Sequence, residues 1–239
     1  MHQINLGNIN IDIIAKDIKN VHLAVLPPLG RVRISAPKRM NLETIRMFAI
    51  TKLSWIKRQQ SKMLKQEREG VKNYVNRESH YFLGKRYLLK VVESNHKPSV
   101  LLNHSTIVLN VRTNSSSEQR QIILQEWYRN QLKEVSSKMI KKWEKKINVE
   151  VAELAIRRMK TRWGSCNQQS KKINLNLELA KKPLQCLEYI IVHEMVHFLE
   201  RKHSKKFISY MNKFLPNWKH CKQNLNFLPT NYLINYNQH

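Results

Sequence analysis

Residues 190–199 form an apolar run containing the pattern H-E-x-x-H, which constrains the fold of this chain more than any other stretch. The pattern consists of His193, Glu194 and His197. On an α-helix, residues four apart lie on one face, so both imidazoles can direct a ring nitrogen at one metal ion. Glu194 can then act as a base toward water bound to that metal. Three ionisable groups on a buried helix without a metal would carry an unexplained desolvation cost, so we favour a metal-binding helix over a chance spacing.

A catalytic zinc usually has three protein ligands and one open position, so the pattern requires a further ligand. Many H-E-x-x-H enzymes use a later glutamate, but this chain has no Asp or Glu after Glu200. We favour His203, because it lies six residues past His197 and a short turn can return it to the metal. The other downstream candidates are His220, Cys221 and His239.

Glu200 lies seven residues after His193 and would project from nearly the same face of a continuous helix. It could orient a ligand histidine, or it could be a solvated residue at the helix end. The sequence does not decide between these roles. We expect about one zinc per chain, although three imidazoles also accept cobalt, nickel or copper.

The composition limits the class of protein. The chain has 239 residues, of which 41% are hydrophobic, enough for one large or two small domains with a sizeable core. It shows neither an N-terminal apolar segment nor a run of about 18 apolar residues, so we expect a cytoplasmic protein without a membrane partner. The three cysteines form no C-x-x-C pair, which argues against a disulfide framework and a cysteine-built zinc site.

The net charge of +26 arises from 43 Lys and Arg against 17 Asp and Glu. Such an excess suits polyanionic partners, including a nucleic acid bound through the basic surface. The alternative is a lysine-rich and asparagine-rich composition that simply coats the surface. We favour this alternative, because no arginine-rich tail or nucleic-acid motif accompanies the charge.

The hydrophobic pattern predicts an α+β fold. Residues 1–112 are β-rich, with one helix from residue 41 to about residue 66, and a hairpin around Gly84. Residues 113–239 contain a long helix from about 118 to 146, an alternating strand over 173–179 and the H-E-x-x-H helix. We therefore predict a β-rich N-terminal region, 1–112, and a catalytic domain, 113–239.

Several motifs together resemble the YgjP-like metal-dependent hydrolases, which are relatives of the SprT-like minimal zinc metallopeptidases. The motifs are R-W-G-S-C at 162–166, I-x-L-N at 173–176, H-E-x-x-H at 193–197 and H-S at 203–204. The match is close over about residues 150–215. The resemblance implies a minimal zincin-like catalytic domain in which His193, His197 and His203 hold zinc and Glu194 is catalytic.

The resemblance also implies that the strand 173–179 borders the cleft, where an extended substrate could add by strand pairing. Asn174 and Asn176 on this strand are therefore candidate substrate-binding residues. Arg158, Lys160 and Arg162 are further candidates, because cations facing the metal could hold a polyphosphate. Outward, solvated charges are the alternative for this segment, and we favour it.

The expected function is that of a zinc-dependent hydrolase of the metallopeptidase type. Metal-bound water, activated by Glu194, would attack a peptide carbonyl. In one alternative the metal site is the same but the protein is a nucleoside triphosphate pyrophosphatase, an activity assigned to a bacterial member of the family. Another is a nucleic-acid-associated protein recruited by its basic surface.

Overall fold

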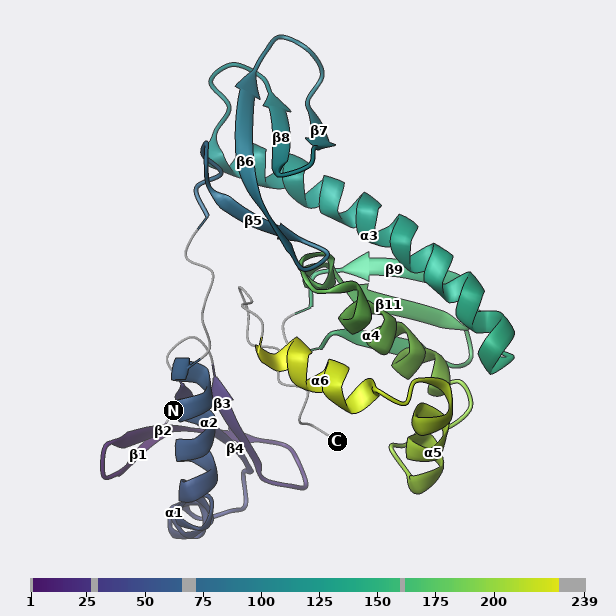
Figure 1. Cartoon of the computed structure of the whole chain (residues 1–239). Coiled ribbons are helices and arrows are strands. Elements are labelled where there is room, and N and C mark those ends of the chain that lie inside the picture. The colour runs from purple at the N-terminus through teal and green to yellow at the C-terminus, as the bar shows by residue number, and fades with distance from the viewer. Residues whose placement is uncertain (1, 27–29, 66–71, 160–161, 228–239) are drawn as a thin grey trace. The chain divides into compact units, whose positions relative to one another are not determined.

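The computed structural model describes residues 2–26, 30–65, 72–159 and 162–227. The chain divides into two compact units, with the boundary near residues 68 and 69. Each unit has its own hydrophobic core and is described by itself. Helices and strands occur in both units (Figure 1), which confirms the predicted α+β class.

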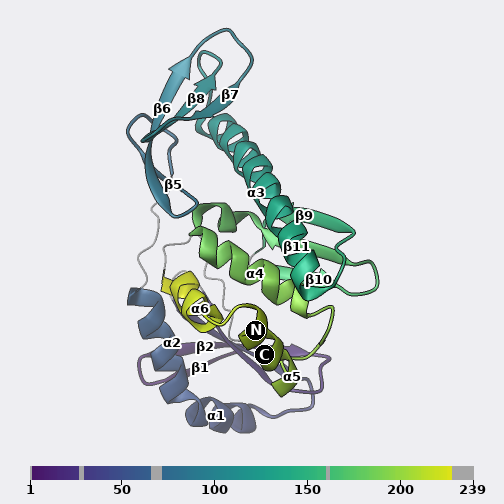
Figure 2. The ribbon, with the colours of Figure 1, turned by 45° about the vertical axis from the view of Figure 1, so that its right-hand side comes forward.

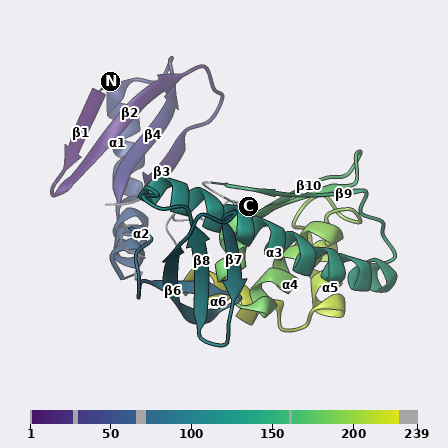
Figure 3. The same cartoon turned by 90° about the horizontal axis from the view of Figure 1, so that it is seen from above.

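The first unit contains a four-stranded sheet, whose strands Figure 3 shows side by side. In spatial order they are β1 (His2–Leu6), β2 (Ile9–Lys16), β4 (Arg31–Pro37) and β3 (His22–Leu26). β2 and β4 pair in parallel, and the other neighbours are antiparallel. Alternating apolar residues such as Ile11, Val32 and Ile34 are fully buried, because one face of this sheet forms the core of the unit.

The helical part of the first unit differs from the single helix predicted over 41–66. The described residues form two helices, α1 (Leu42–Thr51) and α2 (Leu53–Lys65). The Asn41 side chain caps α1 by accepting a backbone N–H at 2.8 Å. Lys52 ends α1, and its N–H bonds back to carbonyls of the last turn. This break allows both helices to bury apolar side chains in one core.

The second unit contains two sheets and the helices around them. One sheet, in spatial order, has β5 (Ser79–Phe82), β6 (Lys85–Glu93), β8 (Thr106–Val111) and β7 (Ser99–Leu102). The other has β10 (Gly164–Asn167), β11 (Lys172–Asn176) and β9 (Glu153–Arg157). The helices are α3 (Ser117–Ile147), the 3-10 helix η1 (Leu177–Lys181), α4 (Leu184–Val196), α5 (Lys205–Phe214) and α6 (Trp218–Phe227). α4 packs between α3 and α6 (Figure 2).

The predicted domain boundary at 112/113 needs correction, because strands β5 to β8 belong to the second unit. The turn of the β5–β6 hairpin lies on η1, where Leu83 and Gly84 donate backbone hydrogen bonds to two η1 carbonyls at 2.8 and 3.2 Å. Tyr128 of α3 donates its hydroxyl to the Tyr81 carbonyl at 2.9 Å. These long-range bonds and a shared core join the strands to the C-terminal helices.

The predicted strand 173–179 is also corrected. Only 172–176 is strand, and 177–181 forms η1. The change begins at Asn176, whose side-chain oxygen accepts the Glu178 N–H at 3.2 Å and so caps the 3-10 turn. Leu177 and Leu179 remain buried in this turn, so alternating apolar residues alone did not reveal the strand end.

Candidate metal centre

Helix α4 carries the H-E-x-x-H pattern through the core of the second unit. Pro183 is its N-cap, a position at which proline gives up no helical hydrogen bond. The helix is buried from Tyr189 to Val196, so this stretch crosses the core. His193 and Glu194 are only 6% and 4% exposed, so their polar groups are held in apolar surroundings.

His203 returns to the helix from the following turn. Its Nε2 atom lies 3.1 Å from the Nε2 atom of His193. One ligand atom from each of His193, His197 and His203 lies within 4.8 Å of the other two. The three ring centroids are 4.7 to 5.0 Å apart. The rings therefore converge on one point, as a tripod of imidazole donors must.

Two neighbouring groups orient these rings. The Nδ1 atom of His197 lies 3.1 Å from the Glu200 backbone oxygen, which leaves its Nε2 atom to face the other histidines. The centroid of the Phe207 ring lies 4.7 to 5.0 Å from the centroids of all three imidazole rings. Ser204 caps α5 by accepting the Phe207 N–H, so the turn that carries His203 also places this ring.

Glu200 contacts a ligand histidine, as one sequence-based alternative expected, but through its backbone. Its backbone oxygen, rather than its carboxylate, contacts His197. The carboxylate instead accepts the backbone N–H of Lys202 at 3.2 Å. Glu200 therefore shapes the turn that returns His203 to the helix.

Strand β10 forms a close-fitting wall beside Glu194. A Cβ atom added to Gly164 would lie 2.7 Å from Glu194 Oε1 and 2.9 Å from its Cγ atom. Cys166, two residues along the same face, donates its thiol hydrogen bond to the Glu194 carboxylate. Burial and the nearby carboxylate raise the pKa of Cys166 to about 12, so its thiol stays protonated and keeps donating.

Burial raises the pKa of Glu194 to about 8, while the Cys166 hydrogen bond and the positive charge of Arg162 act in the opposite direction. Desolvation of the Glu194 carboxyl therefore outweighs both stabilising interactions. A carboxyl group with a pKa near neutrality is suited to accept and release a proton. Arg162 itself is exposed, so its guanidinium can also meet a substrate.

The other proposed substrate contacts are placed differently. Asn174 lies opposite Ser165 in the β10–β11 pair, on the face of the sheet away from Gly164 and Cys166, and bonds to Ser165 Oγ at 3.3 Å. Asn176 is fully buried and holds the carbonyls of Met159 and Arg162 at 2.9 and 2.7 Å. Asn174 therefore lies on the other face of the sheet and Asn176 fixes a loop, so their substrate contacts stay predictions that this placement does not favour.

The basic segment before β10 is only partly described. Arg158 follows β9 and is exposed, and Lys160 lies outside the described residues. Arg162 is the candidate from this segment whose charge reaches Glu194.

Two of the remaining ligand candidates, His220 and Cys221, do not join the histidine cluster. His220 is exposed on α6, and its Nε2 atom lies 2.9 Å from the Asn224 amide. Cys221 is buried, and its carbonyl accepts a contact from the Cys186 thiol at 3.8 Å. His239 lies outside the described residues.

The edge of the small sheet also differs from the expectation. β11 pairs with β10 on one side and with β9 on the other, so its backbone cannot accept an added strand. β10 is the edge strand that lies against α4.

The sequence assigned no role in the site to Gly164, Cys166 and Phe207. An isolated glycine in a strand is the one signal of close approach that the sequence offered.

Substituting Gly164 by Ala is expected to impair the site. The new methyl group would displace the Glu194 carboxylate, and overpacking of this kind costs about 1–3 kcal/mol of unfolding free energy. A displacement of about 1 Å at a catalytic group can lower kcat about 100-fold. Kinetics and denaturant unfolding measure both effects, with Ser165→Ala on the opposite face as control. Unchanged kcat in Gly164→Ala would mean that β10 does not position Glu194.

A buried helix with converging histidines, a neighbouring carboxylate and a small mixed sheet define the class of metal-dependent hydrolases. The chain belongs to the YgjP-like family, because the family model "YgjP-like, metallopeptidase domain" matches residues 19–227. This membership places it among metal-dependent peptidases. No curated protein matches the sequence.

Two solved structures resemble part of the chain. One is the metallopeptidase zymogen abylysin of Pyrococcus abyssi, at 17% identity, with a TM-score of 0.36, covering 38% of this chain and 90% of abylysin. The other is the metallopeptidase zymogen jannalysin of Methanocaldococcus jannaschii, at 21% identity, with a TM-score of 0.33, covering 39% of this chain and 92% of jannalysin. No helix among the described residues combines the length and apolar character needed to span a bilayer.

Proposed function

We propose that this chain is a zinc-dependent peptidase, with His193, His197 and His203 as zinc ligands and Glu194 as general base. The observation that carries the proposal is the convergence of the three ring nitrogens within 4.8 Å beside a buried glutamate of the same helix. Three imidazole donors fit zinc, and a tripod leaves a coordination position for solvent or substrate.

The residues around the site have separate tasks in this proposal. A bound zinc would supply Lewis acidity, which polarises a carbonyl and lowers the pKa of water toward neutrality. Glu194 takes the proton from the attacking water and can pass it to the leaving amine. The Cys166 thiol and the close contact at Gly164 hold the Glu194 carboxylate in place. β10, as the edge strand beside Glu194, offers backbone groups for pairing with an extended peptide.

Metal removal and restoration test this proposal. Purified protein is expected to hold about one zinc per chain by elemental analysis. It should cleave unstructured polypeptides, lose this activity on chelation and regain it with added zinc. The cleavage products of a peptide library, read by mass spectrometry, would also identify the bond. Zinc-loaded protein that cleaves no member of a diverse library would contradict a peptidase function.

A second reaction at the same site is nucleotide hydrolysis. The exposed Arg162 guanidinium, whose charge reaches Glu194, is the observation that favours it, because guanidinium groups bind phosphates. Pyrophosphate release from a panel of nucleoside triphosphates, measured on the same zinc-loaded preparation, separates the two reactions. The comparisons give no support to a nucleic-acid partner, which remains a prediction from charge.

A further inference from the structure

The turn that carries His203 is strongly basic. Arg201, Lys202, Lys205 and Lys206 all lie within three residues of His203, and all four are exposed. The chain contains no acidic residue after Glu200, so this turn and both following helices lack any Asp or Glu. Glu200 directs its carboxylate at a backbone N–H of the turn. Positive charge therefore accumulates on the side of the histidine cluster formed by residues 201–206.

The segment that contains β10, the strand beside Glu194, is also positively charged. No acidic residue occurs between Glu153 and Glu178, a segment that contains all of β10 and β11. Within it, exposed Arg162 lies close enough to Glu194 for its charge to lower the pKa of that carboxyl. Cations thus belong to both segments that form the site.

Some cations elsewhere in the second unit are paired with carboxylates. On α3, Lys138 pairs with Glu134 at 2.6 Å. Next to the small sheet, Lys171 pairs with Glu150 at 2.9 Å. By contrast, the five cations around the histidines form no ion pair with any residue that the structure describes. They are Arg162, Arg201, Lys202, Lys205 and Lys206. These five cations are therefore free of ion pairs with described carboxylates, and their charge can act on a substrate at the histidine cluster.

We infer that the site selects acidic polypeptide segments, whose Asp and Glu side chains on either side of the cleaved bond meet these five cations. This inference rests on the proposed peptidase function, which makes the polyanion a peptide. In an extended peptide, side chains alternate between two faces at about 3.3 Å per residue, so carboxylates can reach both flanking segments. Basic peptides are repelled by the same charges, which gives discrimination as well as attraction.

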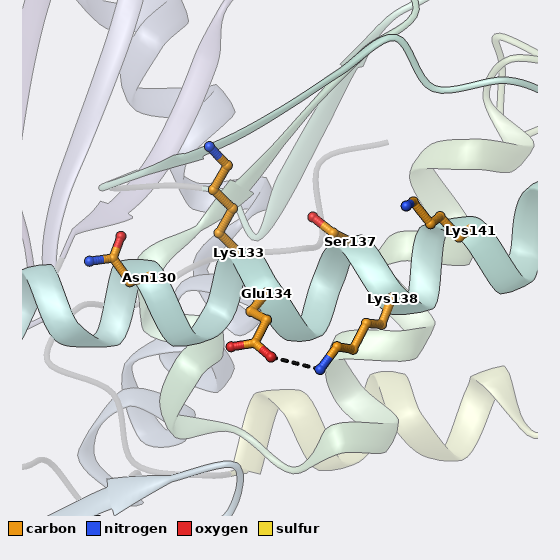
Figure 4. Close-up of a pocket in the computed structure, with 6 residues that line it drawn as sticks. All are labelled: Asn130, Lys133, Glu134, Ser137, Lys138 and Lys141. Atoms are coloured by element: carbon orange, nitrogen blue, oxygen red, sulfur yellow. Dashed lines mark hydrogen bonds and ion pairs between the residues drawn. The ribbon is translucent and has the colours of Figure 1, made fainter. Parts of the chain in front are cut away.

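The outer face of α3 provides a matched control. A cavity of about 400 Å³ lies there, lined by Asn130, Lys133, Glu134, Ser137, Lys138 and Lys141. Figure 4 shows the Glu134–Lys138 ion pair within this set. Lys133 and Lys141 are exposed and form no ion pair with a described residue. Reversing these two lysines changes the net charge as much as reversing two lysines beside His203, but at a surface without site residues.

The experiment compares the double variant Lys202→Glu/Lys205→Glu with the control Lys133→Glu/Lys141→Glu. Substrates are peptides of one sequence in which the flanking residues are Glu or, in the matched peptide, Gln. Each exposed ion pair between a peptide carboxylate and a site cation should raise kcat/KM by up to a few-fold. Several together should give wild type about a tenfold higher kcat/KM for the Glu peptide than for the Gln peptide. High salt should reduce this preference. The site variant should lose it, and the control should keep it, with zinc content equal in all proteins.

Binding to zinc-loaded Glu194→Gln protein tests the inference separately from cleavage. Fluorescence anisotropy should show about tenfold tighter binding of the labelled Glu peptide than of the Gln peptide, and loss of this difference in the site variant. Equal binding of both peptides, or an equal preference in site and control variants, would overturn the inference. A further outcome would also overturn it: an oligonucleotide of the same charge binds more tightly than the Glu peptide, and the site variant loses this binding. The ligand of the site would then be a nucleic acid. Selective binding without cleavage would refute the peptidase function alone.

Discussion

Replacing Glu194 by Gln is expected to lower kcat for peptide cleavage by about 100-fold to 10,000-fold, the range that a positioned general base contributes. Glutamine has nearly the same shape, so it can occupy the space between Gly164 and Cys166. Its amide cannot accept the proton of the attacking water. The three histidines are unchanged, so zinc content should stay at about one per chain. Steady-state kinetics and elemental analysis of the same preparation measure both quantities.

Glu200→Gln is the matched control for this experiment. Its carboxylate accepts one backbone N–H of the turn, and a glutamine oxygen can accept the same bond. We expect its kcat to remain within a few-fold of wild type, since exposed or half-buried substitutions of this kind change stability by only about 0.5 kcal/mol. Full activity in Glu194→Gln, or an equal loss in Glu200→Gln, would remove Glu194 from the proposed mechanism.

His203→Ala is expected to weaken zinc binding by more than the roughly 10-fold to 100-fold that loss of a hydrogen-bond partner of a ligand costs. The variant removes one of the three ring nitrogens that lie within 4.8 Å of one another. His203 is exposed, so the metal-free variant should unfold close to metal-free wild type. Zinc present at about 100 times its Kd stabilises a folded protein by about 2.7 kcal/mol, and His203→Ala should lose most of this increment. Competition with a metal indicator and thermal unfolding with and without zinc measure these effects.

His220→Ala separates a ligand from a surface histidine. His220 is exposed on α6 and contacts the Asn224 amide, away from the cluster. Its removal should leave zinc affinity and the zinc-dependent rise in Tm unchanged. A loss of zinc in His220→Ala, with normal binding in His203→Ala, would refute the proposed ligand set and support the alternative ligand considered from sequence.

Features encoded by neighbouring residues could be predicted from the sequence. The spacing in H-E-x-x-H placed both histidines one turn apart on a helix, which α4 forms. Ser204, part of the H-S motif, caps α5 immediately after His203. The long helix predicted from about 118 to 146 followed from its hydrophobic pattern, and it forms as α3. In each case the interacting groups lie within a few residues, so chain geometry alone relates them.

Contacts between distant segments were decided only by the tertiary structure. The predicted strand 173–179 was expected to border the cleft. In the structure the strand is β11, and β9 and β10 pair with both of its edges, because pairing depends on residues elsewhere in the chain. The close approach of Gly164 to Glu194 joins residues thirty apart. Contacts between distant segments also place strands β5 to β8 in the second unit. The hydrogen bonds between the β5–β6 turn and η1 join residues about a hundred positions apart in the sequence.

The sequence by itself therefore determined the chemistry of the site: an imidazole-rich metal motif and a buried carboxylate on one helix. The tertiary structure decided which strand lies beside that carboxylate, where Asn174 and Asn176 are placed and which cations lie around the histidines. The physical reason is that helical periodicity is a local property, whereas strand order and the packing of side chains from separate elements depend on the whole fold.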